Sequence, residues 1–195
     1  VKLDVDKTEF LGYVDLTSSA QVMALIAEGE KVESAEAGTQ VQVVLDQTPF
    51  YAESGGQIGD RGYLSGDNVV VRIEDVQKQN NIFVHFGRVE RGTLQLGMTV
   101  NAQIDAACRR RAQANHTATH LLQAALRSLV DQSISQAGSL VSFDRLRFDF
   151  NCPRGLKPEE VEQVEAQVNS WIAEAHPATV AEMPLDEAKA KGAVA

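Results

Sequence analysis

Hydrophobic and polar residues alternate in short runs through the N-terminal half of the chain. Val22, Ala24 and Ile26 belong to the clearest run, which ends at a Glu28-Gly29 turn. Similar β-rich runs cover 41–45, 69–73, 82–86 and 100–104, with Gln79-Asn80-Asn81 as a hairpin loop. Short runs bounded by Gly, Asn and Asp are typical of antiparallel strands. The pattern therefore predicts a small antiparallel β-barrel over residues 1–105.

The periodicity becomes helical after Asp105. Residues 107–130 contain neither Gly nor Pro, and Leu122, Leu126 and Leu129 recur at helical spacing. A hairpin should follow over 138–143 and 145–150, because apolar and charged residues alternate strictly in its second strand. These features predict a long helix followed by two antiparallel strands.

A second amphipathic helix should begin at Pro158, since proline is tolerated in a first helical turn. Its expected apolar face consists of Val161, Val164, Val168, Trp171 and Ile172. Pro177 should end it, residues 178–183 resemble a strand, and another helix should begin at Leu185. The fold class is therefore α+β: a β-barrel module over 1–105, then an α+β module over 106–195 whose long helix packs on an antiparallel sheet.

Composition narrows the partners and the compartment. The formal net charge is −9, which disfavours general nucleic-acid binding except near Arg109-Arg110-Arg111 and Arg127. These arginines could equally form an ordinary solvated face. No apolar run has the length of a membrane span, and the two cysteines lie in dissimilar contexts, so a reducing cytoplasm is expected. A chain that starts at Val1 and stops in mid-pattern is expected to be an excerpt of a longer one.

Two histidines four residues apart are the strongest candidate for chemistry. His116 and His120 would share one helical face, at a spacing that zinc can bridge, although the same spacing also occurs in ordinary partly buried pairs. A zinc peptidase would need Glu directly after the first His, where this chain has Thr117. Thr119 lies nearer the histidine face than Thr117 does. Since Cys108, Cys152, His85 and His176 are poorly placed as further ligands, those are expected beyond Ala195.

A glycine-rich stretch over residues 50–62 is the second candidate. Its four glycines, among them Gly55 and Gly56, indicate tight turns whose exposed amides could hold a phosphate or a polar tail. The stretch matches neither the phosphate-loop pattern nor the dinucleotide fingerprint. A tight corner in a barrel remains the alternative.

Four segments, in this order, resemble the editing region of alanyl-tRNA synthetases and the free-standing alanyl-tRNA editing proteins. They are 46–62, Asn115–Leu121, Gln136–Leu140 and Leu146–Phe150. The resemblance implies a hydrolase that deacylates tRNA(Ala) mischarged with serine or glycine, acting within a longer ligase. It also implies that His116 and His120 are zinc ligands, and that Thr119 and Gln136 orient the aminoacyl group and water.

The resemblance further implies that the tRNA 3′ acceptor end is bound by the glycine-rich loop and the arginines. The residues concerned are Gly55, Gly56, Gln57, Arg109, Arg110 and Arg127. The family's other two zinc ligands, in a Cys-Gly-Gly-Thr-His segment, are absent from this sequence. The chain alone is therefore expected to fold but to be a weak deacylase with incomplete zinc binding. The alternatives are a non-catalytic module that binds the acceptor end and a segment kept for stability or assembly.

Overall fold

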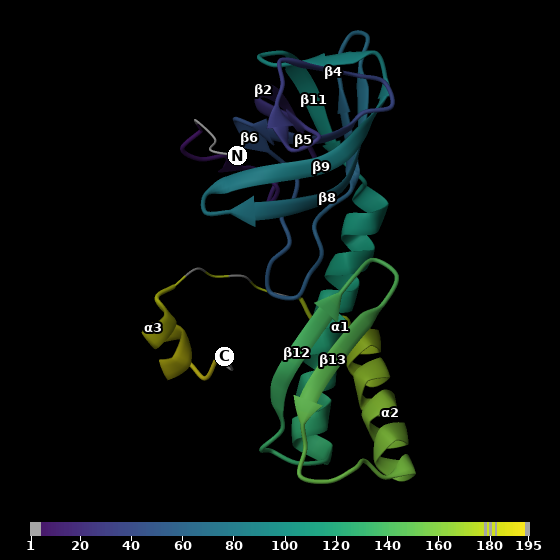
Figure 1. Ribbon diagram of the computed structural model, residues 1–195. Helices are drawn as coiled ribbons and strands as arrows, with labels where there is room; N and C mark the ends of the chain where they lie inside the picture. The colour runs from purple at the N-terminus through teal and green to yellow at the C-terminus, as the bar shows by residue number, and fades with distance from the viewer. Residues whose placement is uncertain (1–4, 178, 180, 182, 194–195) are drawn as a thin grey trace.

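The computed structural model describes residues 5–177, 179, 181 and 183–193. A β-barrel and a smaller α+β unit lie end to end, and helix α1 (Ala106–Leu129) runs from the barrel down the length of the second unit (Figure 1). The predicted α+β fold, with a barrel followed by a helix-and-hairpin unit, is confirmed. No helix in the described part of the chain has the length and apolarity needed to cross a membrane.

Six antiparallel strands close the barrel. They are β2 (Thr17–Ala27), β5 (Gln40–Leu45), β7 (Gly62–Ser65), β8 (Val70–Gln79), β9 (Ile82–Arg91) and β11 (Thr99–Ile104). Their order is β11-β7-β8-β9-β5-β2, and pairing of β11 with β2 completes the ring. Five shorter strands do not belong to this ring: β1 (Glu9–Phe10), β3 (Glu30–Lys31), β4 (Ser34–Glu36), β6 (Gln47–Thr48) and β10 (Thr93–Gln95).

Alternation of buried and exposed residues along strands such as β11 produces the barrel core. In β11, Val100, Ala102 and Ile104 are buried while the residues between them face solvent. Phe50, Leu45 and Leu64 are fully buried in the same cluster. Because side chains of a strand point alternately to its two faces, this pattern fills the barrel. Ala24, Val44 and Val84 form a second, smaller buried cluster.

His85 is a fully buried polar residue within this core. Its Nδ1–H donates to the carbonyl oxygen of Val43 at 2.9 Å, and its Nε2 accepts from the hydroxyl of Thr48 at 2.8 Å. Both ring nitrogens are thus satisfied in the neutral form. Burial lowers the pKa of His85 from its ordinary value of 6.5 to about 4.

His85 should make the chain less stable in mild acid. The pKa is lower in the folded state, so below pH 6.5 the unfolded state binds the proton first, and stability falls until about pH 4. The free energy of unfolding should drop by about 2 kcal/mol between pH 7.5 and pH 5 from this residue alone. Urea unfolding at the two pH values measures the drop. A His85→Gln variant should lose most of it, and an equal drop in that variant would assign the effect to other groups.

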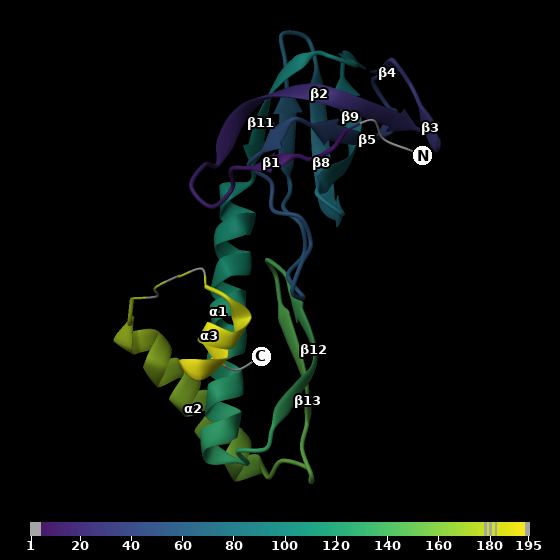
Figure 2. The same cartoon turned by 90° about the vertical axis from the view of Figure 1, so that its left-hand side faces the viewer.

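The second unit packs around α1. Asp105 caps this helix, its carboxylate accepting from the backbone N–H groups of Ala107 and Cys108. Strands β12 (Ser135–Val141) and β13 (Leu146–Asn151) form a hairpin along one side of α1, and α2 (Pro158–Glu174) lies along another (Figure 2). Their shared core contains Ala125, Leu126, Ile134 and Val164, with Leu122, Phe148, Phe150 and Trp171 packed against it.

Two expectations for the C-terminal part need correction. Val161 and Ile172 of α2 are 49% and 53% exposed, so only Val164, Val168 and Trp171 of the predicted face pack inward. The reason is that α2 meets its neighbours along a narrow stripe, with solvent on both sides. Of the strand predicted over 178–183, residues 178, 180 and 182 lie outside the described residues, and the described ones form no strand.

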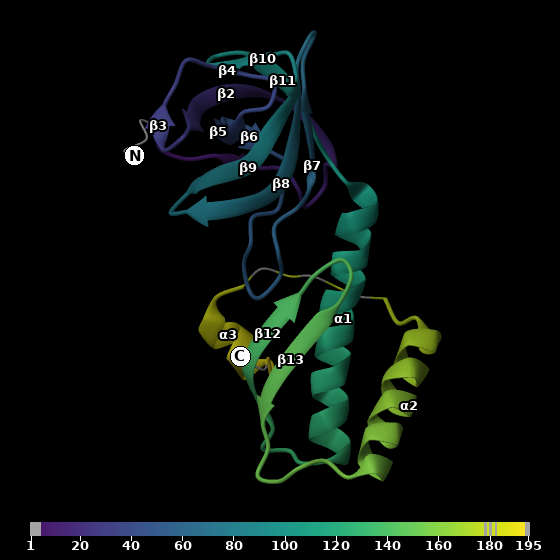
Figure 3. The same cartoon turned by 45° about the vertical axis from the view of Figure 1, so that its right-hand side comes forward.

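The last described helix, α3 (Leu185–Ala190), begins where the sequence predicted. It buries no residue and stands apart from the hairpin in Figure 1. Figure 3 shows the hairpin and α2 on opposite sides of α1. Both described cysteines are free.

Candidate functional site

The glycine-rich stretch forms a long loop that leaves the barrel after β6 and reaches the hairpin of the second unit (Figure 1). At its tip Ser54 and Gln57 exchange backbone hydrogen bonds of 3.1 and 3.0 Å. Gly55 and Gly56 between them have φ values of +58° and +83°, which favour glycine. A Cβ on Gly56 would lie 2.8 Å from the carbonyl oxygen of Ser139, so only glycine allows this close approach.

Backbone hydrogen bonds fasten this tip to β12. The N–H of Val141 donates to Gly56 at 2.7 Å, and the N–H of Ile58 donates to Val141 at 3.0 Å. Gln57 pairs with Val141 as a parallel bridge. The loop is therefore held against the end of the hairpin, which directs the Gln57 side chain toward α1.

Gln57 contacts the histidine pair. The Nδ1–H of His116 donates to Oε1 of Gln57 at 2.8 Å, which leaves the lone pair of Nε2 free. The rings of His116 and His120 are stacked, with centroids 5.1 Å apart and planes 18° apart. Partial burial, and then the like charge of His120, lower the pKa of His116, so that the neutral imidazole predominates at neutral pH.

These two imidazoles fit half of a zinc site. A hydrogen bond from the second ring nitrogen to a carbonyl-type oxygen is the usual outer support of a metal-binding histidine, and Gln57 provides it. Among the described residues no group of three or more His, Cys, Asp or Glu side chains could hold a metal ion. A complete tetrahedral set would need further ligands.

Thr119 is buried, whereas Thr117 is exposed. The hydroxyl of Thr119 donates to the carbonyl oxygen of Asn115 at 2.8 Å, and its oxygen keeps lone pairs for a further partner. The Asn115 amide in turn donates to the carbonyl oxygen of Ser142 at 2.7 Å. The Asn115 contact thus joins the helix to the residue that follows β12, one position before His116.

Gln136 is exposed near the start of β12, directly before a bulge. It pairs with Phe150, and directly opposed residues share one face of a sheet, so Gln136 is on the side that faces α1. Five residues of strand separate it from Val141, a span of roughly 16 Å. No described contact brings Gln136 to the imidazoles, so its part in the site remains a prediction.

The arginines fall into two groups. Arg110 is exposed, and Arg127 is half-buried and lines an open cleft of about 530 Å³ with His120 and Gln132. Arg109, in contrast, is only 8% exposed and ion-paired with Asp60. Its other donors bind the carbonyl oxygens of Gly12 and Pro49 at 2.8 and 2.9 Å. A phosphate could reach Arg109 only by displacing these groups, which favours a structural role over the expected tRNA contact.

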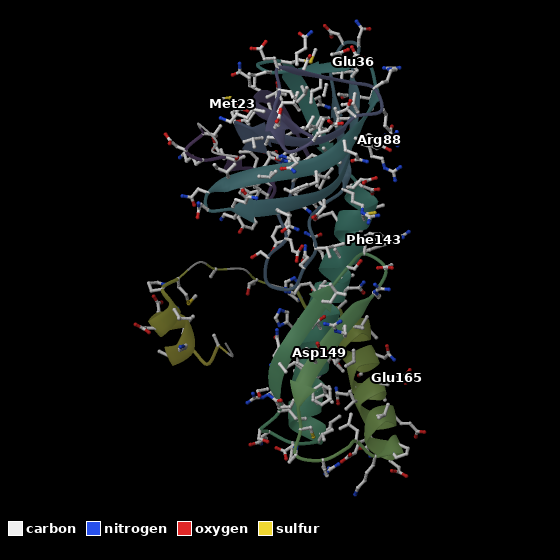
Figure 4. All side chains as sticks on the ribbon, viewed as in Figure 1. Met23, Glu36, Arg88, Phe143, Asp149 and Glu165 are labelled. Carbon is white, nitrogen blue, oxygen red and sulfur yellow. The ribbon has the colours of Figure 1, made fainter. Side chains whose placement is uncertain are left out.

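Sequence reasoning missed the residues that join the two units. Asp60 accepts from Arg109 and from the backbone N–H of Tyr51, and Arg61 lies over the ring of Phe143, 4.7 Å from its centroid. Figure 4 shows Phe143 at the turn of the hairpin, close below the barrel. Each partner is far from the other in sequence, so no local pattern signals the pair.

Comparison with known proteins identifies relatives of the whole chain. Residues 2–108 match the family described as tRNA synthetases class II (A). The chain is 86% identical over 195 residues to the alanine–tRNA ligase of Trichodesmium erythraeum. Over 191 residues it is 72% identical to that of Nostoc punctiforme and 69% identical to that of Microcystis aeruginosa. These matches cover 98–100% of this chain, which spans 22% of the length of each relative.

The family match ends at Cys108, whereas the ligase matches extend through α1 and the hairpin. The similarity to alanine–tRNA ligases therefore includes the histidine pair.

Proposed function

We propose that this chain supplies the hydrolytic editing site of alanine–tRNA ligase. The chain belongs to the class II (A) tRNA synthetases and corresponds to a segment of that ligase. The site would cleave the ester that joins a wrong amino acid, serine or glycine, to tRNA(Ala). One observation carries the proposal. The hydrogen bond from His116 to Gln57 joins the barrel loop to the histidine pair and leaves a neutral imidazole nitrogen available.

A second site is a chemical necessity for an enzyme that selects alanine. A pocket for alanine cannot exclude the smaller glycine, and an apolar pocket rejects an added hydroxyl only weakly. A site that hydrogen-bonds a hydroxyl group, in contrast, discriminates strongly against an analogue lacking it. Thr119 suits this task, because its oxygen can accept a hydrogen bond from the serine hydroxyl.

The glycine-rich loop and the histidines would have separate roles in the reaction. The glycine-rich tip would lie against the acceptor end, and Arg127, beside His120 in the cleft, would attract its phosphates. Gln57 fixes the ring of His116 and keeps its proton on Nδ1, so that Nε2 keeps a free lone pair for the site. Gln136 would orient water or the aminoacyl group from the hairpin.

Nε2 of His116 and a ring nitrogen of His120 would be two ligands of a zinc ion, with the remaining ligands supplied by the rest of the ligase chain. Zinc bound there would polarise the ester carbonyl or lower the pKa of a bound water. Hydrolysis adds water to the ester carbonyl carbon, breaks the bond to the ribose oxygen and returns a proton to that oxygen.

The competing function is a module that binds the tRNA acceptor end without chemistry. The loop and the exposed arginines would serve it equally well. The stacked, partly exposed imidazoles, held by an amide oxygen, favour hydrolysis, because phosphate binding requires no such arrangement.

The test measures release of serine, glycine and alanine from tRNA(Ala). The assay protein is the intact Trichodesmium erythraeum ligase with its matching segment exchanged for this chain, since the chain spans 22% of that protein. We expect serine to be released at least roughly tenfold faster than alanine. Release at the spontaneous rate with tRNA binding retained would favour the binding module and contradict the proposal.

A further inference from the structure

A cavity of about 330 Å³ opens on the barrel, and neither His116 nor His120 lines it. Its walls come from the chain's first described residues, from β1, from the start of the glycine-rich loop and from the ends of β8 and β9. The lining residues are Lys7, Thr8, Phe10, Tyr13, Tyr51, Ala52, Ser54, Lys78, Asn81 and Phe83. Figure 2 shows β1 and β8 on the lower side of the barrel, from which the loop descends. This volume is within the usual range for small-ligand pockets.

Aromatic rings form the apolar part of this cavity. Phe10 is stacked on Phe83 with centroids 5.4 Å apart, and it meets Tyr13 and Tyr51 edge-to-face, with centroids 5.0 and 6.3 Å apart. Tyr13 is 81% exposed, although it belongs to this cluster. An exposed aromatic ring beside stacked ones offers a face on which a planar ligand can stack.

The charge of the cavity is opposite to that of the chain. The formal net charge of the protein is −9, yet the lining contains two lysines and no acidic residue. Neither Lys7 nor Lys78 forms an ion pair with any residue in the described part of the chain. The ammonium group of Lys78 lies 5.6 Å from the centroid of the Phe83 ring. A planar aromatic ligand that also carries negative charge satisfies both features.

The cavity is connected to the proposed editing site through one short turn. Ser54 lines the cavity and also forms the turn whose other end, Gln57, binds His116. The hydroxyl of Tyr51 donates to the carbonyl oxygen of Ser54 at 3.2 Å. A strand of RNA that enters the editing site along the loop would therefore pass the cavity.

We propose that this cavity binds one unpaired nucleotide of RNA, with the base stacked on the exposed ring of Tyr13 and a phosphate between Lys7 and Lys78. The identification of that RNA as the acceptor end of tRNA rests on the proposed editing function. A free nucleotide carries the same base and phosphate, but the short path from the cavity to Gln57 favours a nucleotide within a strand.

The test uses the 195-residue chain and an acceptor-stem RNA in which 2-aminopurine replaces one unpaired 3′ nucleotide at a time. Stacking quenches the fluorescence of 2-aminopurine. The protein should quench it at one position, and Tyr13→Ala should abolish the quenching and weaken RNA binding about tenfold. Lys78→Gln should lower the slope of log affinity against log salt by about one. Tyr63→Ala, on an exposed tyrosine of β7, and Lys191→Gln, directly after α3, are the matched controls.

Each result decides the proposal. Quenching that survives Tyr13→Ala, or that Tyr63→Ala removes equally, would overturn it. Displacement of the RNA by AMP at an equal nucleotide concentration would overturn the choice of a strand over a free nucleotide. Serine release without quenching refutes the cavity alone, whereas quenching without serine release refutes the editing function alone.

Discussion

Replacing His116 by alanine is expected to slow serine release from Ser-tRNA(Ala) by roughly 100- to 1000-fold, the range for removal of one positioned group at a reacting centre. The loss follows because the variant lacks the imidazole whose free Nε2 Gln57 positions. Affinity for tRNA should change less than about threefold, since a neutral imidazole adds little to phosphate binding. Single-turnover release and filter binding, both with the exchanged ligase, measure the two quantities separately.

The matched control is His176→Ala. His176 is exposed after α2 and pairs only with Glu174 among the described residues, so its removal should leave serine release unchanged. Equal losses in both variants would indicate a general effect on folding. Loss of tRNA binding in parallel with hydrolysis in His116→Ala would favour the binding module.

Replacing Arg109 by methionine is expected to destabilise the chain by about 3–5 kcal/mol. The substitution leaves the carboxylate of Asp60 buried without its partner, and an unpaired buried charge is costly. It also releases the carbonyl oxygens of Gly12 and Pro49 from their donors. Urea unfolding measures the loss. Arg110→Met, at the exposed neighbouring position, should cost less than about 0.5 kcal/mol.

A second variant separates the lost ion pair from lost packing. Asp60→Asn added to Arg109→Met removes the stranded charge while an amide oxygen can still accept from Tyr51, so part of the stability should return. If Arg109→Met were no more destabilising than Arg110→Met, the ion pair would not hold barrel and helix together.

Local sequence patterns were sufficient for the elements but not for their junction. The strict alternation in β11 and the uninterrupted helical stretch of α1 led to correct predictions, because each pattern reflects one buried face. Asp105 similarly lies where a helix cap is expected. In α2, however, the predicted face was too wide, since periodicity does not reveal how much of a helix its neighbours cover.

The site depended on long-range contacts that no local pattern contains. Fifty-nine positions separate Gln57 from His116, and forty-nine separate Asp60 from Arg109. The sequence singled out Gln57 only as a loop residue for tRNA, whereas the structure gives it a contact with the histidine pair. Arg109 was grouped with Arg110 by adjacency, yet successive helical residues point about 100° apart, and one is buried while the other is exposed.

The central claim is that the barrel loop and the histidine pair act as one hydrolytic unit. The most direct test is a double-mutant cycle on the rate of serine release, with Gln57→Ala, His116→Ala and both together. If Gln57 acts by positioning His116, Gln57→Ala should slow release by about 10- to 100-fold, and the double variant should be no slower than His116→Ala alone. Multiplied losses in the double variant, or an unchanged rate in Gln57→Ala, would contradict the account.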